Sequence, residues 1–153
     1  MKLGDLLDET QVRIFPEPAL KEEIITAMVD LLPASRNPAV REEILRGVRE
    51  REGIETTGLG HGVAFPHGIA AVGSAVHIAL GIARQPVDFQ SLDGEPVRLV
   101  FMLVGSEENR EVQLKVLARA SRLFRQPALR EALAQARDAA QALRLLHEAE
   151  RED

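Results

Sequence analysis

The feature that most constrains this chain is a glycine-rich stretch from Thr57 to Gly68, which reads TGLGHGVAFPHG. It contains four glycines and one proline, and it leads to His67, which Pro66 precedes and Gly68 follows. Glycine permits positive φ angles and lets a second molecule approach the main chain closely, whereas proline fixes φ and removes a backbone donor. An isolated glycine-rich turn is most often only a turn. The Pro-His-Gly ending, however, predicts a turn that presents His67 as a nucleophile.

A histidine suits this role because an imidazole offers a neutral nucleophilic nitrogen near pH 7. A phosphoryl group on such a nitrogen keeps a high transfer potential. Backbone N–H groups beside the ring would stabilise the equatorial phosphoryl oxygens in the transition state, where catalysis is mostly positioning and electrostatics. The segment therefore favours reversible phosphoryl relay over hydrolysis.

Several segments together carry a resemblance to a known family. They are Arg51-Glu52, Thr57–Gly60, Val63–Gly68, Asp93–Val104 and Glu111–Phe124. In this order they resemble the type 2 enzyme IIA domains of the bacterial sugar phosphotransferase system, the group of fructose, mannitol and nitrogen-regulatory IIA proteins. The resemblance covers nearly the whole chain, and the Pro-His-Gly segment with its upstream Arg-Glu pair is a specific part of it.

The resemblance implies that His67 accepts a phosphoryl group from a histidine phosphocarrier protein. It would then pass the group to a IIB subunit or signal its phosphorylation state to a regulated protein. By the same analogy Arg51 lies beside the phosphohistidine, where a planar guanidinium matches phosphate oxygens as a lysine would not; without the resemblance, Arg51 is read as an ordinary solvated charge. Gly68 and Thr57 are expected to support the site, although the Thr57 hydroxyl would equally stabilise a turn.

The chain departs from the family pattern at Gln113. Many members have a second histidine in a His-Leu pair at the place where this chain has Gln113-Leu114. A glutamine can donate a neutral hydrogen bond to a phosphate oxygen or to the His67 ring, but it brings no positive charge. Its spacing from Leu117 and Phe124 also suits a half-buried polar residue at the end of an apolar stripe. A phosphorylation-silent regulatory or binding module of the same fold therefore remains an alternative.

A histidine metal site is the alternative from another chemical class. If the segment between them is extended at about 3.3 Å per residue, His61 and His67 lie roughly 20 Å apart. They could not then share a zinc ion at Zn–N distances of about 2 Å. A bent segment would still leave the site short of ligands, and the sequence has no cysteine. We therefore expect no metal and no cofactor, and no phosphate-loop or dinucleotide motif suggests a bound nucleotide.

Composition limits the class of protein further. The 153 residues fit a single domain, 1–153, and the lack of cysteine suits a reducing compartment. No apolar run reaches the roughly 20 residues of a membrane span, and no signal-peptide pattern is present, so we expect a cytoplasmic protein without direct membrane insertion. A formal charge of −5, with no basic stripe and no aromatic stacking platform, argues against nucleic-acid binding.

Hydrophobic periodicity predicts helices interspersed with strands. Helices are expected over residues 18–31, 38–53, 107–124, 127–136 and 138–150, and strands over residues 63–65, 76–82 and 97–104. The second helix starts with Asn37 as N-cap and Pro38 as first residue, and it brings Arg51 near its carboxyl end. Residues 97–104 are almost continuously apolar, which is typical of a central strand. The family resemblance implies an α/β fold with a single mixed β-sheet of about five strands, flanked by helices on both faces.

Overall fold

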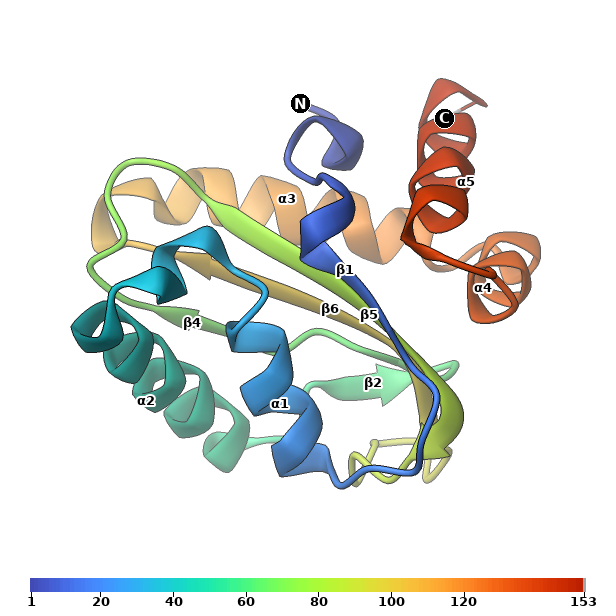
Figure 1. Ribbon diagram of the computed structural model, residues 1–153, viewed down its shortest axis with the longest axis horizontal. Helices are drawn as coiled ribbons and strands as arrows, with labels where there is room; N and C mark the ends of the chain where they lie inside the picture. The colour runs from blue at the N-terminus through green and yellow to red at the C-terminus, as the bar shows by residue number, and fades with distance from the viewer. Residues whose placement is uncertain (153) are drawn as a thin grey trace.

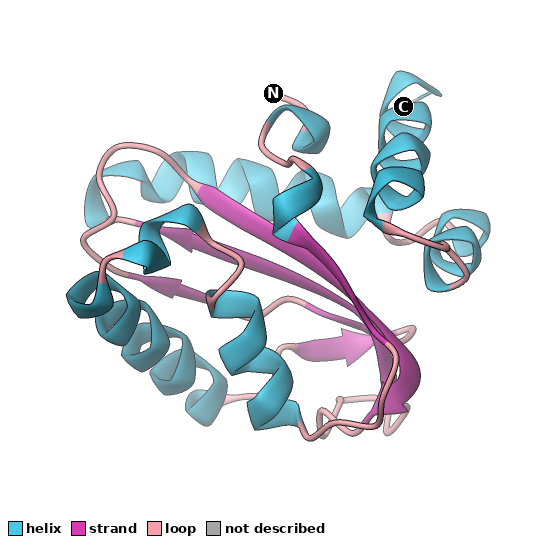
Figure 2. Cartoon of the chain, in the orientation of Figure 1, coloured by secondary structure: helices cyan, strands magenta, loops and turns pink. Residues whose placement is uncertain are grey.

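A mixed sheet of six strands forms the centre of the molecule, and helices cover both of its faces (Figure 1, Figure 2). The computed structural model describes residues 1–152. The strands are β1 (Val12–Phe15), β2 (Gly58–Gly60), β3 (Val63–Ala64), β4 (His67–Ile69), β5 (His77–Val87) and β6 (Val97–Gly105). The helices are α1 (Lys21–Val29), α2 (Pro38–Ile54), α3 (Arg110–Leu123), α4 (Pro127–Ala134) and α5 (Ala139–Glu152). The expected fold class is confirmed, with six strands where about five were expected.

The order of the strands places His67 directly beside the long central strand β6. The order is β1-β5-β6-β3-β2, with β5 antiparallel and β3 parallel to β6, and β4 also pairs with β6. β3 and β4 lie end to end along β6, with Val63 opposite Leu99 and His67 opposite Leu103. Between them Pro66 has no N–H to donate, but its carbonyl accepts a hydrogen bond from the Leu103 N–H at 3.0 Å. His67 is therefore the first residue of β4, directly after the interruption.

Alternate side chains of β6 enter two different apolar cores. Leu99, Phe101 and Leu103 pack with residues of α3, α4 and α5, whereas Val100, Met102 and Val104 pack with residues of α1 and α2. None of these six side chains is more than 2% exposed. A strand covered on both faces needs an apolar residue at every position, which explains the continuous run seen in the sequence.

The helices start and end within about three residues of the positions expected from the sequence, and α1, expected over residues 18–31, is shorter at both ends. The Asn37 side chain caps α2 by accepting a hydrogen bond from the Ala39 N–H at 3.0 Å. The sequence predicts that this helix ends at Gly53, but α2 continues to Ile54. α3 is preceded by a short 3-10 helix, Glu107–Asn109, within the range expected to be α-helical. Within the described residues, none of the helices is long and apolar enough to cross a membrane.

α2 and β4 meet backbone to backbone through two glycines. A Cβ atom on Gly47 of α2 would lie 2.6 Å from the Ile69 carbonyl oxygen. A Cβ atom on Gly68 of β4 would lie 2.8 Å from the Val48 nitrogen. Both distances are shorter than real Cβ contacts, so no other residue fits either position without moving the helix or the strand. This close approach fixes the part of α2 that carries Arg51 relative to the strand that carries His67.

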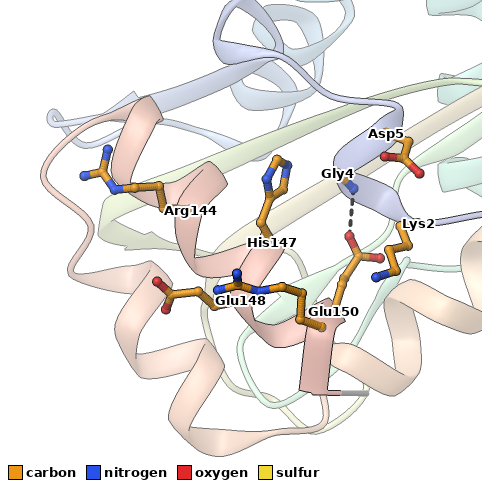
Figure 3. Close-up of a pocket in the computed structure, with 8 residues that line it drawn as sticks. Lys2, Gly4, Asp5, Arg144, His147, Glu148 and Glu150 are labelled. Carbon is orange, nitrogen blue, oxygen red and sulfur yellow. Dashed lines mark hydrogen bonds between the residues drawn. The ribbon is translucent and has the colours of Figure 1, made fainter.

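The two ends of the chain are fastened together by Glu150 of α5 (Figure 3). Its buried carboxylate accepts hydrogen bonds from the backbone N–H groups of Leu3 at 2.7 Å and Gly4 at 2.8 Å. It also accepts a hydrogen bond from Arg119 Nε of α3 at 2.7 Å. A buried carboxylate needs such partners, and Glu150 therefore joins the amino-terminal 3-10 helix Leu3–Asp5 to the last helix of the fold.

Candidate functional site

Three elements converge on a cavity of about 600 Å³ that contains most of the predicted site residues. It is lined by Gly47, Glu50, Arg51 and Ile54 of α2, by His67, Gly68 and Ile69 of β4, and by Arg110, Gln113, Leu114 and Leu117 of α3. Arg51, His67, Gly68 and Gln113 are thus brought together, whereas Thr57 does not line the cavity. The cavity is therefore the candidate site.

The His67 ring is held in one orientation by the backbone. Its Nδ1 lies 2.8 Å from the Phe65 carbonyl oxygen. A carbonyl only accepts hydrogen bonds, so Nδ1 must carry the ring proton in the neutral form, and Nε2 then keeps its lone pair. The ring is half-buried. The arrangement leaves Nε2 as the ring nitrogen whose lone pair is available to a reacting group.

Phe65, which provides this carbonyl, is itself firmly anchored. Its ring packs against those of Phe101 and Phe124, with centroid separations of 6.2 Å in both cases and tilted planes. Its N–H donates to the Thr57 carbonyl oxygen at 3.1 Å. Aromatic packing of this kind immobilises the residue that orients His67. The Phe65 side chain therefore packs against the core, whereas His67, two residues later, lines the cavity.

Arg51 reaches the cavity from the last turn of α2, as the sequence pattern predicts. One of its terminal nitrogens, Nη1, donates to the Glu55 carbonyl oxygen at 2.7 Å, which satisfies a carbonyl at the helix end. Arg51 follows Gly47 by four residues, so both lie on the face of α2 that meets β4. The contact between the two backbones thus accounts for the presence of a guanidinium at the cavity that His67 lines.

Gln113 lines the cavity, but its two N–H groups are already engaged. Its Nε2 donates to the Ser106 carbonyl oxygen at 2.8 Å and to Asn109 Oδ1 at 2.7 Å. The side chain is buried and lies closely against Gly105, where a Cβ atom would be 2.3 Å from Gln113 Nε2. The hydrogen bond to phosphate or to His67 expected from the sequence would therefore require one of these contacts to break. What Gln113 does in this arrangement is fix the start of α3.

Thr57 does not line the cavity and is hydrogen-bonded to Glu52 instead. Its hydroxyl donates to Glu52 Oε1 at 2.6 Å, and its N–H donates to Glu52 Oε2 at 2.7 Å. Lys21 Nζ lies 3.0 Å from the same Oε2 atom. Of the two roles considered for the Thr57 hydroxyl, the structure supports the stabilisation of the turn. The Arg51-Glu52 pair of the sequence therefore has divided roles, since Arg51 lines the cavity and Glu52 fastens the glycine-rich segment to α2.

Arg110 also lines the cavity, although it is not among the site residues predicted from the sequence. Its side chain is 61% exposed, and it donates from Nε to Glu107 Oε2 at 2.7 Å and from Nη2 to Oε1 at 3.0 Å. These hydrogen bonds hold the pKa of the Glu107 carboxyl below its usual range. The only signal in the sequence is that Arg110 precedes Gln113 by three residues, which places both on one face of a helix.

The other histidines lie away from this cavity. His61 is exposed in the glycine-rich turn with a φ of 60°, and its N–H donates to Asp93. His77 opens β5, with Nε2 at 3.4 Å from the Val72 carbonyl oxygen, and His147 is exposed on α5. Among the residues that the structure describes, no group of three or more His, Cys, Asp or Glu side chains could hold a metal ion.

Comparison with known sequences identifies the family. The profile of the family described as "Phosphoenolpyruvate-dependent sugar phosphotransferase system, EIIA 2" matches residues 5–149. The nitrogen regulatory protein of Bradyrhizobium diazoefficiens is 37% identical over 121 residues, which are 79% of this chain and 75% of that protein. The fructose-specific EIIABC component of Bacillus subtilis is 33% identical over 136 residues, which are 89% of this chain but only 21% of that longer protein.

The solved structures agree with this result. The nitrogen regulatory protein IIA-Ntr of Neisseria meningitidis superposes with a TM-score of 0.83 at 29% identity, covering 94% of this chain and 98% of that one. IIA mannitol of Escherichia coli shares the fold, with a TM-score of 0.75 at 20% identity and coverage of 92% and 98%. The chain therefore belongs to the EIIA type 2 family of the phosphotransferase system, whose general function is to relay phosphoryl groups.

Proposed function

We propose that this protein is a nitrogen-regulatory or fructose-like IIA component that carries a phosphoryl group on Nε2 of His67. The observation that supports this proposal is the contact between His67 Nδ1 and the Phe65 carbonyl oxygen at 2.8 Å, which leaves Nε2 as the nucleophile. The same cavity contains the Arg51 guanidinium. In this proposal the whole chain, 1–153, acts as one domain, although Asp153 lies outside the described residues.

The chemistry follows from the positions of these groups. Nε2 attacks the phosphorus of a phosphohistidine on the donor, the donor's N–P bond breaks, and its electron pair returns to the donor ring. The His67 ring gains positive charge as the new N–P bond forms, and the Phe65 carbonyl stabilises that charge by accepting from Nδ1–H. Arg51 would donate to the equatorial phosphoryl oxygens, where the negative charge is spread. No activating base is needed because the attacking nitrogen is already unprotonated.

The surface around the cavity suits a protein partner. Ile54 of α2 and Leu114 of α3 line it and are 82% and 68% exposed, respectively. Large apolar side chains that remain exposed beside a reactive group are typical of a surface that another protein covers. We propose a histidine phosphocarrier protein as donor, and a IIB subunit or a regulated protein as acceptor. In support of a IIB partner, enzyme IIAMTL of Escherichia coli has been solved in complex with phosphorylated enzyme IIBMTL.

A phosphorylation-silent regulatory or binding module of the same fold is the second candidate. The observation that favours it is Gln113, which brings no charge to the cavity and whose N–H groups are engaged with Ser106 and Asn109. In such a module the cavity would serve only as a docking surface. The two candidates differ in one measurable respect, because only the first predicts phosphate on His67.

The test is incubation with phosphoenolpyruvate, enzyme I and the phosphocarrier protein, followed by measurement of the intact mass. We expect one added phosphate that is labile to acid and stable to alkali, as a phosphoramidate is and a phosphoserine is not. The His67→Gln variant should fold and remain unlabelled. Labelling of that variant at the wild-type rate would show that another residue is the acceptor, and an unlabelled wild-type protein would favour the silent module.

Arg51→Lys tests the second member of the site. The variant keeps the positive charge but loses the planar guanidinium, which can donate to the Glu55 carbonyl oxygen and to a phosphoryl oxygen at the same time. A charge-assisted contact made in the transition state is worth about ten- to a hundredfold in rate. We therefore expect slower transfer in stopped assays, with an unchanged circular dichroism spectrum. Wild-type kinetics in a folded variant would return Arg51 to the role of an ordinary surface charge.

A further inference from the structure

Arg110 brings a second guanidinium to the cavity that contains His67. It is the first residue of α3, and Gln113 and Leu114, about one turn further along, line the same cavity. Residues three and four apart share one face of a helix. Arg110 is thus directed to the cavity by the same face of α3 as Gln113, whereas Arg51 enters from α2.

Without Arg110, the residues that line the cavity provide no net positive charge for a phosphoryl group. A phosphoryl group on His67 would add about two negative charges. Of the residues lining the cavity, Arg51 contributes one positive charge and Glu50 one negative charge, and Gln113 is neutral. Arg51 also commits Nη1 to the Glu55 carbonyl oxygen. Without Arg110, therefore, the fixed charges around the phosphoryl group would nearly cancel.

Arg110 can readily exchange its present partner, Glu107, for another anion. Glu107 is 74% exposed, lies three residues earlier in the chain and does not line the cavity. Exposed pairs between arginine and a carboxylate contribute little, because water solvates both groups well when they separate. A phosphoryl group carries more negative charge than a carboxylate and has three acceptor oxygens, so it competes well for the same planar fork.

We propose that Arg110 is a phosphoryl-binding residue that leaves Glu107 and donates to the phosphoryl group on His67, supplying the positive charge that Gln113 does not bring. This inference rests on the proposed function, since it assumes a phosphoryl group on His67. Glu107 then binds the guanidinium until the anion arrives, and Arg110 exchanges this carboxylate for the phosphoryl group.

The experiment uses potassium phosphoramidate, a small donor that needs no partner protein. Nε2 of His67 forms a bond to phosphorus, the P–N bond of the donor breaks, and its electron pair leaves with ammonia. Phosphorus nuclear magnetic resonance follows the label, and the signal missing from the His67→Gln variant is assigned to His67. Labels on exposed histidines such as His61 serve as an internal control, because they lie away from the cavity.

We expect Arg110→Gln to slow labelling of His67 on the order of three- to tenfold. The variant should also raise the pKa of the phosphoryl group, because a nearby cation favours the dianion. Arg110→Lys should recover part of both effects. The matched control is Arg98→Gln, which removes another exposed arginine paired with a glutamate, Glu131, outside the cavity. The control should leave labelling and phosphoryl pKa unchanged.

Glu107→Gln tests the release step, with Glu131→Gln as its matched control. Freeing Arg110 should speed labelling of His67 and lower the phosphoryl pKa, whereas the control should change neither. Equal rates and equal phosphoryl pKa values in Arg110→Gln and Arg98→Gln would overturn the inference. If phosphoramidate labels His67 but the phosphocarrier does not, the proposed function fails while the Arg110 comparison is still decided. If neither donor labels His67, both are overturned.

Discussion

Replacing Gly47 with alanine should push α2 away from β4. The new Cβ atom would lie 2.6 Å from the Ile69 carbonyl oxygen, whereas ordinary contact begins at 3.4 Å, so the two backbones must separate locally by about 0.8 Å. Overpacking of this kind costs about 1–3 kcal/mol. The higher helix propensity of alanine offsets up to about 1 kcal/mol of that loss. Because Arg51 follows by four residues, the shift would also move its guanidinium, and a misplacement of about 1 Å can slow a reaction about a hundredfold.

Gly53→Ala is the matched control, since Gly53 lies in the same helix and a Cβ atom there would meet nothing within 4 Å. Both variants gain helix propensity, and Gly53→Ala gains less because it lies in the last turn, so their difference in stability is a minimum for the cost of the clash. In urea unfolding followed by circular dichroism, Gly47→Ala should be less stable than Gly53→Ala by about 1–3 kcal/mol. It should also accept phosphate more slowly. Equal unfolding midpoints and equal transfer rates would refute the idea that the close backbone contact positions Arg51.

Three other predictions concern single side chains. Gln113→His should add a titratable ring at the cavity. Transfer should become faster as the pH falls and this ring gains a proton, until His67 is protonated as well, so the rate–pH profile should become a narrow peak. An unchanged profile would show that residue 113 takes no part in the reaction. Glu150→Gln should lower the free energy of unfolding by about 1.5–3 kcal/mol in a urea titration, because Arg119 loses a charged acceptor, and transfer rates should stay at the wild-type value. Hydrogen bonds from Arg41 lower the pKa of Asp30, so the pair stabilises the fold above the usual aspartate pKa and loses that contribution as the pH falls through the lowered value. Asp30→Asn should therefore slightly flatten the acid side of the curve of melting temperature against pH, and a curve of wild-type shape would count against this pair.

The sequence was sufficient to predict the elements whose signal is local. Asn37 and Pro38 mark the start of α2, because a capping side chain and a fixed φ act within one turn. Residues 97–104 mark a central strand, because a strand covered on both faces is apolar at nearly every position, and Arg98 is the one exception in this range. His67 could be singled out for the same reason, since its flanking proline and glycine are adjacent in the chain, and the structure places it at the candidate cavity.

The remaining parts of the site depend on which elements become neighbours. β2 and β4 have three residues each, and they are strands only because β3 and β6 pair with them. Arg110 joins the cavity because the start of α3 lines it together with β4 and the end of α2. Thr57 is excluded because Glu52, in the last turn of α2, accepts both of its hydrogen bonds. Spacing along the chain places Arg110 and Gln113 on one helix face. It does not report that this face lines the cavity or that Glu52 binds Thr57, because these relationships arise only in the fold.

The attachment of the chain ends to each other through Glu150 has a mechanical consequence. A force applied to the two ends would act first on the hydrogen bonds from Leu3 and Gly4 to this carboxylate, and only afterwards on the sheet. In Figure 1 both ends lie well away from α2 and β4, the elements that carry Arg51 and His67. A tether or an additional folded unit attached at either end would therefore pull first on the corner formed by α5 and the amino-terminal turn, and the load would reach α2 and β4 only through the rest of the fold.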